Sequence, residues 1–207
     1  VSVFESGATP YVWKTTSFTR PESSNLQVYE LLVRDFVADR RYKTVADSLG
    51  YLKKLGINAI ELMPVAEFSG NDSWGYNPIF YMAPDKAYGT KNDLKYLIDK
   101  CHENGIAVIM DIVLNQADYE NPYVKMYWDG SKPLATSPFF NPSATHPYSV
   151  FFDFNHESAH TQWLVDVVTK FWLQEYKIDG YRFDLSKGFT QTPSGSNVDL
   201  WGQYDAS

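Results

Sequence analysis

Apolar residues in this chain follow two patterns that alternate regularly. Short apolar runs rich in β-branched and aromatic residues predict strands, and stretches with apolar residues three or four positions apart predict helices. The predicted strands are residues 26–36, 58–64, 107–114 and 178–184, and the predicted helices are residues 44–55, 91–104 and 158–176. Glycines at positions 56 and 105 follow the first two helices, as is typical of helix ends.

The third predicted strand indicates the fold class. Residues 107–114 are almost continuously apolar, which is typical of a strand buried on both faces in a parallel sheet covered by helices. Strands that alternate with helices also require parallel pairing and right-handed crossovers. Both a doubly wound sheet and a (β/α)8 barrel satisfy this α/β pattern. No glycine-rich phosphate-binding motif follows the first strand, which disfavours a dinucleotide-binding fold.

Two segments interrupt the alternation and divide the chain. Residues 1–25 are rich in Ser, Thr, Gly and Pro and are predicted to form an irregular lead-in or linker. Residues 115–157 hold many prolines and aromatic residues without a clear period, and they are too long for an ordinary strand-to-helix connection. We interpret them as a small inserted subdomain. It separates residues 26–114, the first part of the α/β unit, from residues 158–207, its continuation through the fourth strand.

Composition narrows the possible functions without identifying one. The 207 residues include 44% hydrophobic and 16% aromatic residues, which indicates a globular domain with a sizeable core. A net charge of −7 argues against nucleic-acid binding, because nucleic-acid-binding proteins carry basic surfaces. The single cysteine, Cys101, excludes an internal disulfide and leaves the compartment undecided. No apolar run approaches the roughly 18 residues needed to span a membrane.

The fourth predicted strand carries the main candidate chemistry. Arg182 and Asp184 are two positions apart, so their side chains are expected to point to the same face of the strand and to touch. An arginine beside a carboxylate favours the ionised form, as a nucleophile requires. An isolated Arg-x-Asp is more often a structural ion pair. Asp111, at the end of the buried third strand, also needs a partner, because a buried carboxylate without one is costly.

Four short motifs in this chain together resemble the α-amylase family, glycoside hydrolase family 13. The motifs are Trp74-Gly-Tyr-Asn-Pro78, Asp111-Ile-Val-Leu-Asn-Gln116, Asp153-Phe-Asn-His-Glu157 and Gly180-Tyr-Arg-Phe-Asp-Leu-Ser-Lys187. The resemblance extends from about residue 26 to residue 189. It implies the N-terminal half of a (β/α)8 TIM barrel, with strands 1 to 4 and an inserted domain after strand 3.

The resemblance also implies the roles of three catalytic residues. Asp184 matches the nucleophile that forms a covalent glycosyl intermediate, and Arg182 matches the arginine that keeps this aspartate ionised. Asp111 matches an aspartate that orients this pair and the sugar from the neighbouring strand. The implied reaction is the retaining hydrolysis of α-1,4-glucosidic bonds in a glucan such as starch.

Further residues match positions that contact the sugar or a structural calcium ion in the family. Tyr76 matches an aromatic residue that stacks on the sugar, Trp74 extends this platform, and Lys187 matches a contact on the leaving-group side. The alternative for both aromatic side chains is that they pack beneath the long loop that is predicted to follow the second strand, which contains Gly70, Gly75, Pro78, Pro84 and Gly89. The matches to calcium ligands, which are oxygen donors as calcium prefers, are Asn115, Asp153 and the backbone carbonyl of Gly188.

Two positions depart from the family pattern. Gln116 stands where the family usually has histidine, and it can hydrogen-bond a sugar hydroxyl but cannot carry charge. Gly188 stands where the family usually has another histidine, so it keeps the carbonyl but lacks the side-chain contact to substrate. These departures concern the substrate preference more than the reaction type. The family resemblance also suggests secretion or location at the cell surface.

The resemblance leaves part of the catalytic set outside this sequence. A retaining glycosidase needs two carboxyl groups about 5–5.5 Å apart, and in the family the acid/base follows the fifth strand. A third carboxylate follows the seventh strand, so the 207-residue chain alone is expected to be inactive. A sheet that ends at strands 1 and 4 would also have open edges, which predicts that this chain self-associates or is only marginally stable.

Three alternatives stay open from the sequence. The chain could belong to a transglycosylase or branching enzyme of the same family, or it could act as a non-catalytic module that binds carbohydrate or protein. His156-Glu-Ser-Ala-His160 also fits the H-E-x-x-H pattern of zinc proteases, but it lies where a helix is expected to begin rather than on one helix face.

Overall fold

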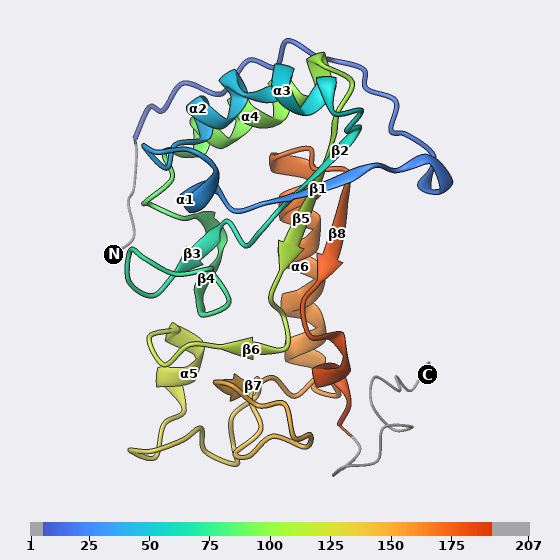
Figure 1. Cartoon of the computed structure of the whole chain (residues 1–207). Helices are drawn as coiled ribbons and strands as arrows, with labels where there is room; N and C mark the ends of the chain where they lie inside the picture. The colour runs from blue at the N-terminus through green and yellow to red at the C-terminus, as the bar shows by residue number, and fades with distance from the viewer. Residues whose placement is uncertain (1–5, 192–207) are drawn as a thin grey trace.

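The computed structural model describes residues 6–191 and arranges them around a four-stranded parallel sheet (Figure 1). Its strands are β1 (Val28–Leu31), β2 (Ala59–Leu62), β5 (Ala107–Ile112) and β8 (Gly180–Phe183). The order of the strands in the sheet is the order in the chain. A doubly wound sheet reverses its strand order at a switch point, and the described sheet has no such reversal. Because the four strands pair in parallel and alternate with helices along the chain, the prediction of a parallel α/β fold is confirmed.

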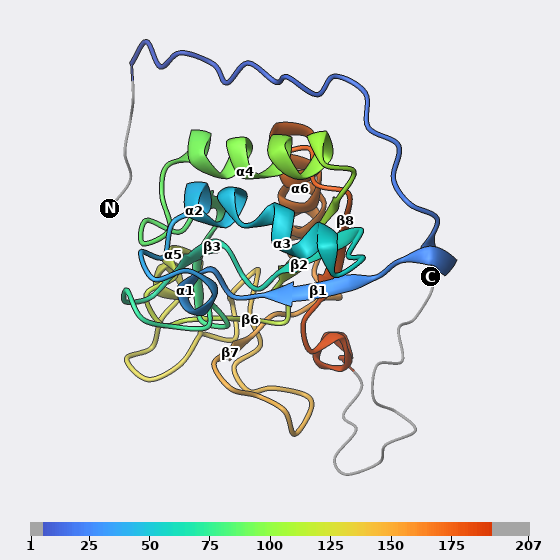
Figure 2. The same cartoon turned by 45° about the horizontal axis from the view of Figure 1, so that its top comes forward.

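Four helices cover one face of this sheet (Figure 2). They are α2 (Tyr42–Asp47), α3 (Leu49–Lys54), α4 (Lys91–Glu103) and α6 (Ala159–Glu175). The first predicted helix is divided in two at Ser48, and the other two lie within two residues of their predicted bounds. A capping box between Thr90 and Asp93 fixes the start of α4.

Two predictions of local structure were wrong. The first strand ends at Leu31, and a short helix, α1 (Val33–Phe36), follows it. The loop predicted after the second strand contains an antiparallel hairpin of β3 (Ala66–Phe68) and β4 (Pro78–Pro84). Prolines at both ends of β4 argued against a strand, but a two-stranded hairpin has open edges that tolerate them.

The segment predicted as an insertion lies beyond the carboxyl ends of the sheet strands (Figure 1). It contains β6 (Gln116–Ala117), α5 (Pro122–Met126) and β7 (Phe152–Asp153), with β6 and β7 paired antiparallel. Its interior is largely aromatic: the Phe140 and Phe154 rings stack with centroids 4.3 Å apart, and both are buried. The short elements explain why no hydrophobic period was visible, since packing here depends on aromatic contacts rather than on repeated stripes.

The described part of the lead-in is irregular, apart from the 3-10 helix η1 (Ser23–Asn25), and it is packed against the sheet domain. The Asp99 carboxylate in α4 accepts hydrogen bonds of 2.9 Å from the Tyr11 hydroxyl and from the backbone N–H groups of Lys14 and Thr15. Residues 11–15 of the lead-in are therefore bound to α4 and do not form a free linker. Residues 1–5, and residues 192–207 of the predicted continuation, lie outside the described part.

No helix within residues 6–191 has the length and apolar content to cross a membrane.

We expect the 207-residue chain to self-associate through the outer strands of the sheet. Val28 in β1 is 43% exposed and Phe183 in β8 is 41% exposed. Exposed strand edges with apolar side chains pair readily with another chain. Sedimentation velocity at rising protein concentration should show larger species, and Val28→Lys should shift the distribution toward monomer. Val150→Lys, at an exposed valine of the insertion, is the matched control. A monomer at every concentration would contradict this expectation.

Candidate active site

The carboxyl ends of β5 and β8 bring the three predicted catalytic residues together. The Nη1 atom of Arg182 donates to both carboxylate oxygens of Asp111, at 3.1 and 3.2 Å. The same atom donates to Asp184 Oδ1 at 2.6 Å. One guanidinium group therefore joins two carboxylates that are 73 positions apart in the sequence. The expected contact between Arg182 and Asp184 is present.

Strand register explains this arrangement. Asp111 of β5 lies opposite Arg182 of β8 in the parallel ladder, and β8 ends one residue before Asp184. Leu185 then takes a left-handed backbone conformation with φ of 43°, which turns the chain out of the strand immediately after Asp184. Such a conformation is costly for a residue other than glycine, and it is typical of functional sites.

The two aspartates differ in their exposure. The Asp111 side chain is fully buried, whereas the Asp184 side chain is 19% exposed. Burial raises the pKa of the Asp111 carboxyl to about 6, against the opposing effect of hydrogen bonds from Tyr76 and Arg182. Burial lowers the pKa of Arg182, but its hydrogen bond to Asp184 and the charge of Asp111 outweigh this, and the net direction is upward. Asp184 is thus the carboxylate that a ligand can reach.

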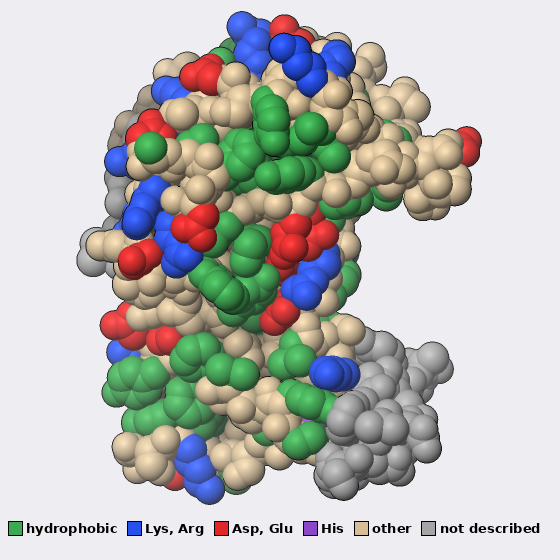
Figure 3. All heavy atoms as spheres, in the orientation of Figure 1, with side chains coloured by type: hydrophobic (Ala, Val, Ile, Leu, Met, Phe, Trp, Pro, Cys, Tyr) green, Lys and Arg blue, Asp and Glu red, His purple; other side chains and the backbone are tan. Residues whose placement is uncertain are grey.

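Glu61, at the end of β2, is a third carboxylate near Arg182 that the sequence analysis did not single out. Its Oε1 lies 4.0 Å from Arg182 Nε. Burial raises the pKa of Glu61. Its signal in the sequence is a lone acidic residue inside an apolar strand. Figure 3 shows acidic and basic side chains gathered beside an apolar patch near the end of β8.

The predicted sugar platform lies on the loop between β3 and β4. The Tyr76 hydroxyl donates to Asp111 Oδ2 at 2.8 Å, and the Trp74 side chain is 59% exposed. Trp74 does not pack beneath the loop, whereas Tyr76 is half-buried against the site. Gly75, with φ of 94°, separates them, and a Cβ there would lie only 2.7 Å from Pro64. No other residue type fits this close approach without strain.

The two remaining predicted sugar contacts have other partners in the structure. Gln116 is only 5% exposed, and its Nε2 donates to the Tyr76 carbonyl at 2.8 Å. Lys187 lies in the 3-10 helix η2 (Ser186–Phe189), with its Nζ 4.1 Å from the centroid of the Tyr148 ring. Because Gln116 is buried and bound to the Tyr76 backbone, its side chain supports the loop of Tyr76 and does not face the solvent.

The predicted calcium ligands form a buried polar cluster between the insertion and the sheet domain. A Cβ at Gly188 would lie 3.3 Å from Asn115 Cβ and from the His146 ring, and His146 Nε2 lies 2.9 Å from Asp153 Oδ1. The other oxygen of Asp153 accepts from Asn141 Nδ2 at 2.7 Å. Asn115 Oδ1 is buried without a hydrogen-bond partner.

These residues do not fit a calcium ion as they are arranged. Calcium takes about six to eight oxygen ligands. Asn115 Oδ1 could serve, but both oxygens of Asp153 are engaged, and the His146 imidazole stands against one of them. Within residues 6–191, no group of three or more His, Cys, Asp or Glu side chains could hold a metal ion.

The zinc alternative is wrong. His156 precedes α6, whose N-cap is Ser158, so the two histidines do not share a helix face. His156 Nε2 lies 2.8 Å from the Leu114 carbonyl, and its ring stacks on Phe189. Burial lowers the pKa of His156 to about 4, so this histidine is a neutral core residue.

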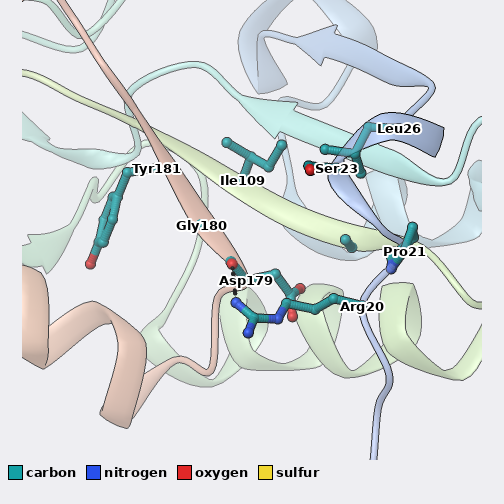
Figure 4. A pocket seen from close by; sticks show the side chains of 9 residues that line it. Arg20, Pro21, Ser23, Leu26, Ile109, Asp179, Gly180 and Tyr181 are labelled. Atoms are coloured by element: carbon teal, nitrogen blue, oxygen red, sulfur yellow. Dashed lines mark hydrogen bonds between the residues drawn. The ribbon is translucent and has the colours of Figure 1, made fainter.

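A hollow at the opposite ends of the strands is separate from this site (Figure 4). It is lined by Arg20, Pro21, Ser23, Leu26, Ala107, Ile109, Asp179, Gly180 and Tyr181. The Arg20 guanidinium donates to the Asp179 carbonyl at 2.9 Å across it. Ala107 and Gly180 begin β5 and β8, whereas the candidate site is where these strands end. Sites in parallel α/β folds lie at the carboxyl ends, so this hollow is not part of the candidate active site.

The fold and the site define a class: a parallel α/β domain with an arginine-linked pair of aspartates at the carboxyl ends of its strands. The family described as "Alpha amylase, catalytic domain" matches residues 17–152. The chain is 33% identical to a 1,4-alpha-glucan branching enzyme of Picrophilus torridus over 91% of its length and 27% of that protein. It is 28% identical to a malto-oligosyltrehalose trehalohydrolase of Saccharolobus solfataricus over 84% of its length and 30% of that protein.

Solved structures agree with these similarities. A Salmonella typhimurium structure superposes with a TM-score of 0.77 at 30% identity, covering 92% of this chain and 31% of that chain. Pullulanase type I from Bacillus subtilis, solved with maltose, gives a TM-score of 0.71 at 26% identity, covering 90% of this chain and 30% of that chain. The chain therefore belongs to the alpha-amylase family, glycoside hydrolase family 13, as part of the catalytic domain. It spans about a third or less of the curated relatives named here.

Asp111 is expected to make folding depend on pH. Its folded pKa of about 6 exceeds the roughly 3.9 of an unfolded aspartate. Between about pH 4 and 6 the folded chain therefore binds the proton more firmly, and stability falls as pH rises. This component is on the order of 3 kcal/mol and should be absent in Asp111→Asn. Urea unfolding at several pH values measures it. The exposed Asp166→Asn should keep the wild-type dependence, and an unchanged dependence in Asp111→Asn would contradict the assignment.

The buried cluster of the insertion is expected to be stable without calcium. EGTA should leave the melting temperature of the chain unchanged, because Asp153 is already paired with His146 and Asn141. His146→Ala should destabilise the fold by about 2 kcal/mol, since it leaves a buried carboxylate oxygen without its partner. His160→Ala, at an exposed position of α6, is the control in thermal unfolding experiments. A loss of several degrees in EGTA would show that the fold does hold the ion.

Proposed function

We propose that this chain supplies the nucleophile of a retaining α-glucan-active enzyme, and that its sheet is the first half of a (β/α)8 barrel. The observation that carries the proposal is the Arg182 guanidinium held between Asp111 and Asp184. Strands in chain order, with helices on one face, support the barrel. The inserted segment at the carboxyl ends of the strands would then form one wall of the substrate cleft.

In this mechanism Asp184 attacks the anomeric carbon of a glucosyl residue. Arg182 hydrogen-bonds Oδ1 of Asp184 and balances its charge. An Asp184 oxygen forms the bond to the sugar while the glycosidic bond breaks, and the electron pair of that bond goes to the leaving oxygen. A second carboxyl group protonates the leaving oxygen and later takes a proton from the incoming water, so that the configuration is retained.

The other site residues position this reaction. Asp111 is buried, so it acts by holding Arg182 and the Tyr76 hydroxyl in place rather than by contacting water. Tyr76 and the exposed Trp74 offer aromatic faces on which a glucose ring can stack. Lys187 lies three residues after Asp184 in the sequence, beyond the turn at Leu185. The proposed substrate is an α-1,4-linked glucan.

The second carboxyl group is proposed to come from a part of the enzyme beyond the fourth strand. Among the described residues, Asp111 and Glu61 both lie against Arg182, and Asp111 is fully buried. Both carboxyl groups face the Arg182 guanidinium, so neither is free to donate a proton to a sugar oxygen as a general acid must. The 207-residue chain alone is therefore proposed to bind α-glucan without turning it over.

Transfer to a sugar hydroxyl is the second candidate for the whole enzyme. Branching enzymes are among the similar proteins, including one from Arabidopsis thaliana that is 34% identical over 94% of this chain and 24% of that protein. Transfer and hydrolysis share the covalent intermediate and differ in whether water or a glucan hydroxyl releases it. The residues described here serve both reactions equally.

Asp184→Asn in the whole enzyme that contains this chain should reduce kcat at least about 1,000-fold, because loss of a covalent nucleophile removes the main reaction path. Binding of a malto-oligosaccharide, measured by calorimetry, should persist. Asp166→Asn, on the exposed face of α6, should keep full activity. Turnover retained in Asp184→Asn would overturn the nucleophile assignment.

A further inference from the structure

Gln116 is a buried residue whose side-chain amide is hydrogen-bonded through both its nitrogen and its oxygen. It begins β6, which follows the strand that carries Asp111 after a connection of residues 113–115, and it is 5% exposed. Its Nε2 donates to the Tyr76 carbonyl at 2.8 Å, and its Oε1 accepts from Asn115 Nδ2 at 3.0 Å. Its backbone carbonyl accepts from the buried Tyr81 hydroxyl at 2.7 Å. The amide therefore has a fixed orientation, with its donor toward the loop of Tyr76.

Tyr76 is consequently held at two points from two directions. Gln116 binds its backbone carbonyl, and Asp111 accepts from its hydroxyl at 2.8 Å. Gly75 lies against Pro64 on the other side, where even a Cβ would clash. The contact with Gln116 positions the backbone of Tyr76, and the contact with Asp111 positions the hydroxyl at the far end of its ring.

Glutamine is suited to this position because it has both a donor and an acceptor on one amide. Glutamate would place an acceptor against the Tyr76 carbonyl. Asparagine carries the same amide but is one methylene shorter. The identity of residue 116 therefore follows from two neighbours, Tyr76 and Asn115, rather than from a sugar hydroxyl.

We propose that Gln116 is a positioning residue that holds Tyr76 against Asp111 at the proposed sugar subsite and does not itself contact the substrate. The part of this inference that concerns the sugar subsite rests on the proposed function. Its structural content, the coupling from Gln116 through Tyr76 to Asp111, can be tested in the 207-residue chain without any turnover.

The first experiment is a double-mutant cycle read out as the titration midpoint of the Asp111 carboxyl by carbon NMR. The charged and titratable groups that face Asp111 are Arg182, Asp184 and Tyr76. Tyr76→Phe removes one hydrogen bond to the carboxylate and should raise the midpoint by about 0.7 pH unit. Gln116→Met, which fills the site without a donor, should raise it in the same direction.

The decisive result is the double variant. Gln116→Met in the Tyr76→Phe background should give no further rise, because both changes act through the same hydroxyl. An independent rise in that background, or no rise in either background, would overturn the proposal. If Gln116→Met does not fold, Gln116→Asn keeps the amide but shortens its reach and serves in the same cycle. A purely structural role would change the melting temperature without moving this midpoint.

The second experiment uses the whole enzyme and a malto-oligosaccharide substrate. Gln116→Met and Tyr76→Ala should each lower kcat/KM, and the double variant should match Tyr76→Ala alone, because Gln116 acts on the sugar only through the Tyr76 ring. Losses that multiply would show that Gln116 touches the sugar, which would overturn the proposal. Failure of the proposed function is distinguishable, because retained turnover in Asp184→Asn would leave the NMR cycle unaffected.

Discussion

The site depends on one cation placed between carboxylates. Arg182 donates to Asp111 and to Asp184, and its Nε faces Glu61 at 4.0 Å. If all three carboxylates were ionised, their charge would exceed that of the guanidinium by two. Burial raises the pKa of Asp111 to about 6 and also raises the pKa of Glu61, so both carboxyl groups take up a proton more readily than free ones do. Asp184 is more exposed than Asp111 and accepts the shortest hydrogen bond from the arginine, which suits the carboxylate that is proposed to meet the sugar.

The strand ends and the insertion cooperate around this cation. β5 provides Asp111 and then leads directly into β6, where Gln116 holds the loop of Tyr76. The insertion returns through β7 and is fastened by the buried contact of Asp153 with His146. The aromatic platform, the nucleophile and the insertion thus meet at one end of the sheet. At the opposite end, the lead-in is bound to the Asp99 carboxylate of α4 and to the backbone carbonyl of Asp179.

Much of this architecture was predictable from local patterns. The helical period located α4 and α6, a glycine marked the end of α4, and the continuous apolar run of residues 107–114 identified the buried central strand β5. The hairpin of β3 and β4 was missed because prolines mark both ends of β4 and because antiparallel pairing depends on a partner strand elsewhere in the sequence. Glu61 and His146 were missed for a similar reason, since their partners are distant in the sequence and only the folded chain brings them together.

By itself, the sequence determined the alternation of strands and helices, the Arg182–Asp184 contact and the family resemblance. These follow from neighbouring residues, whose relative positions are fixed by the backbone period. Only the tertiary structure decided that Asp111 shares Arg182, that Gln116 faces Tyr76 rather than the solvent, and that Asp153 is already paired. Such contacts depend on sheet register and on the burial of polar groups, which are properties of packed elements and not of any one segment.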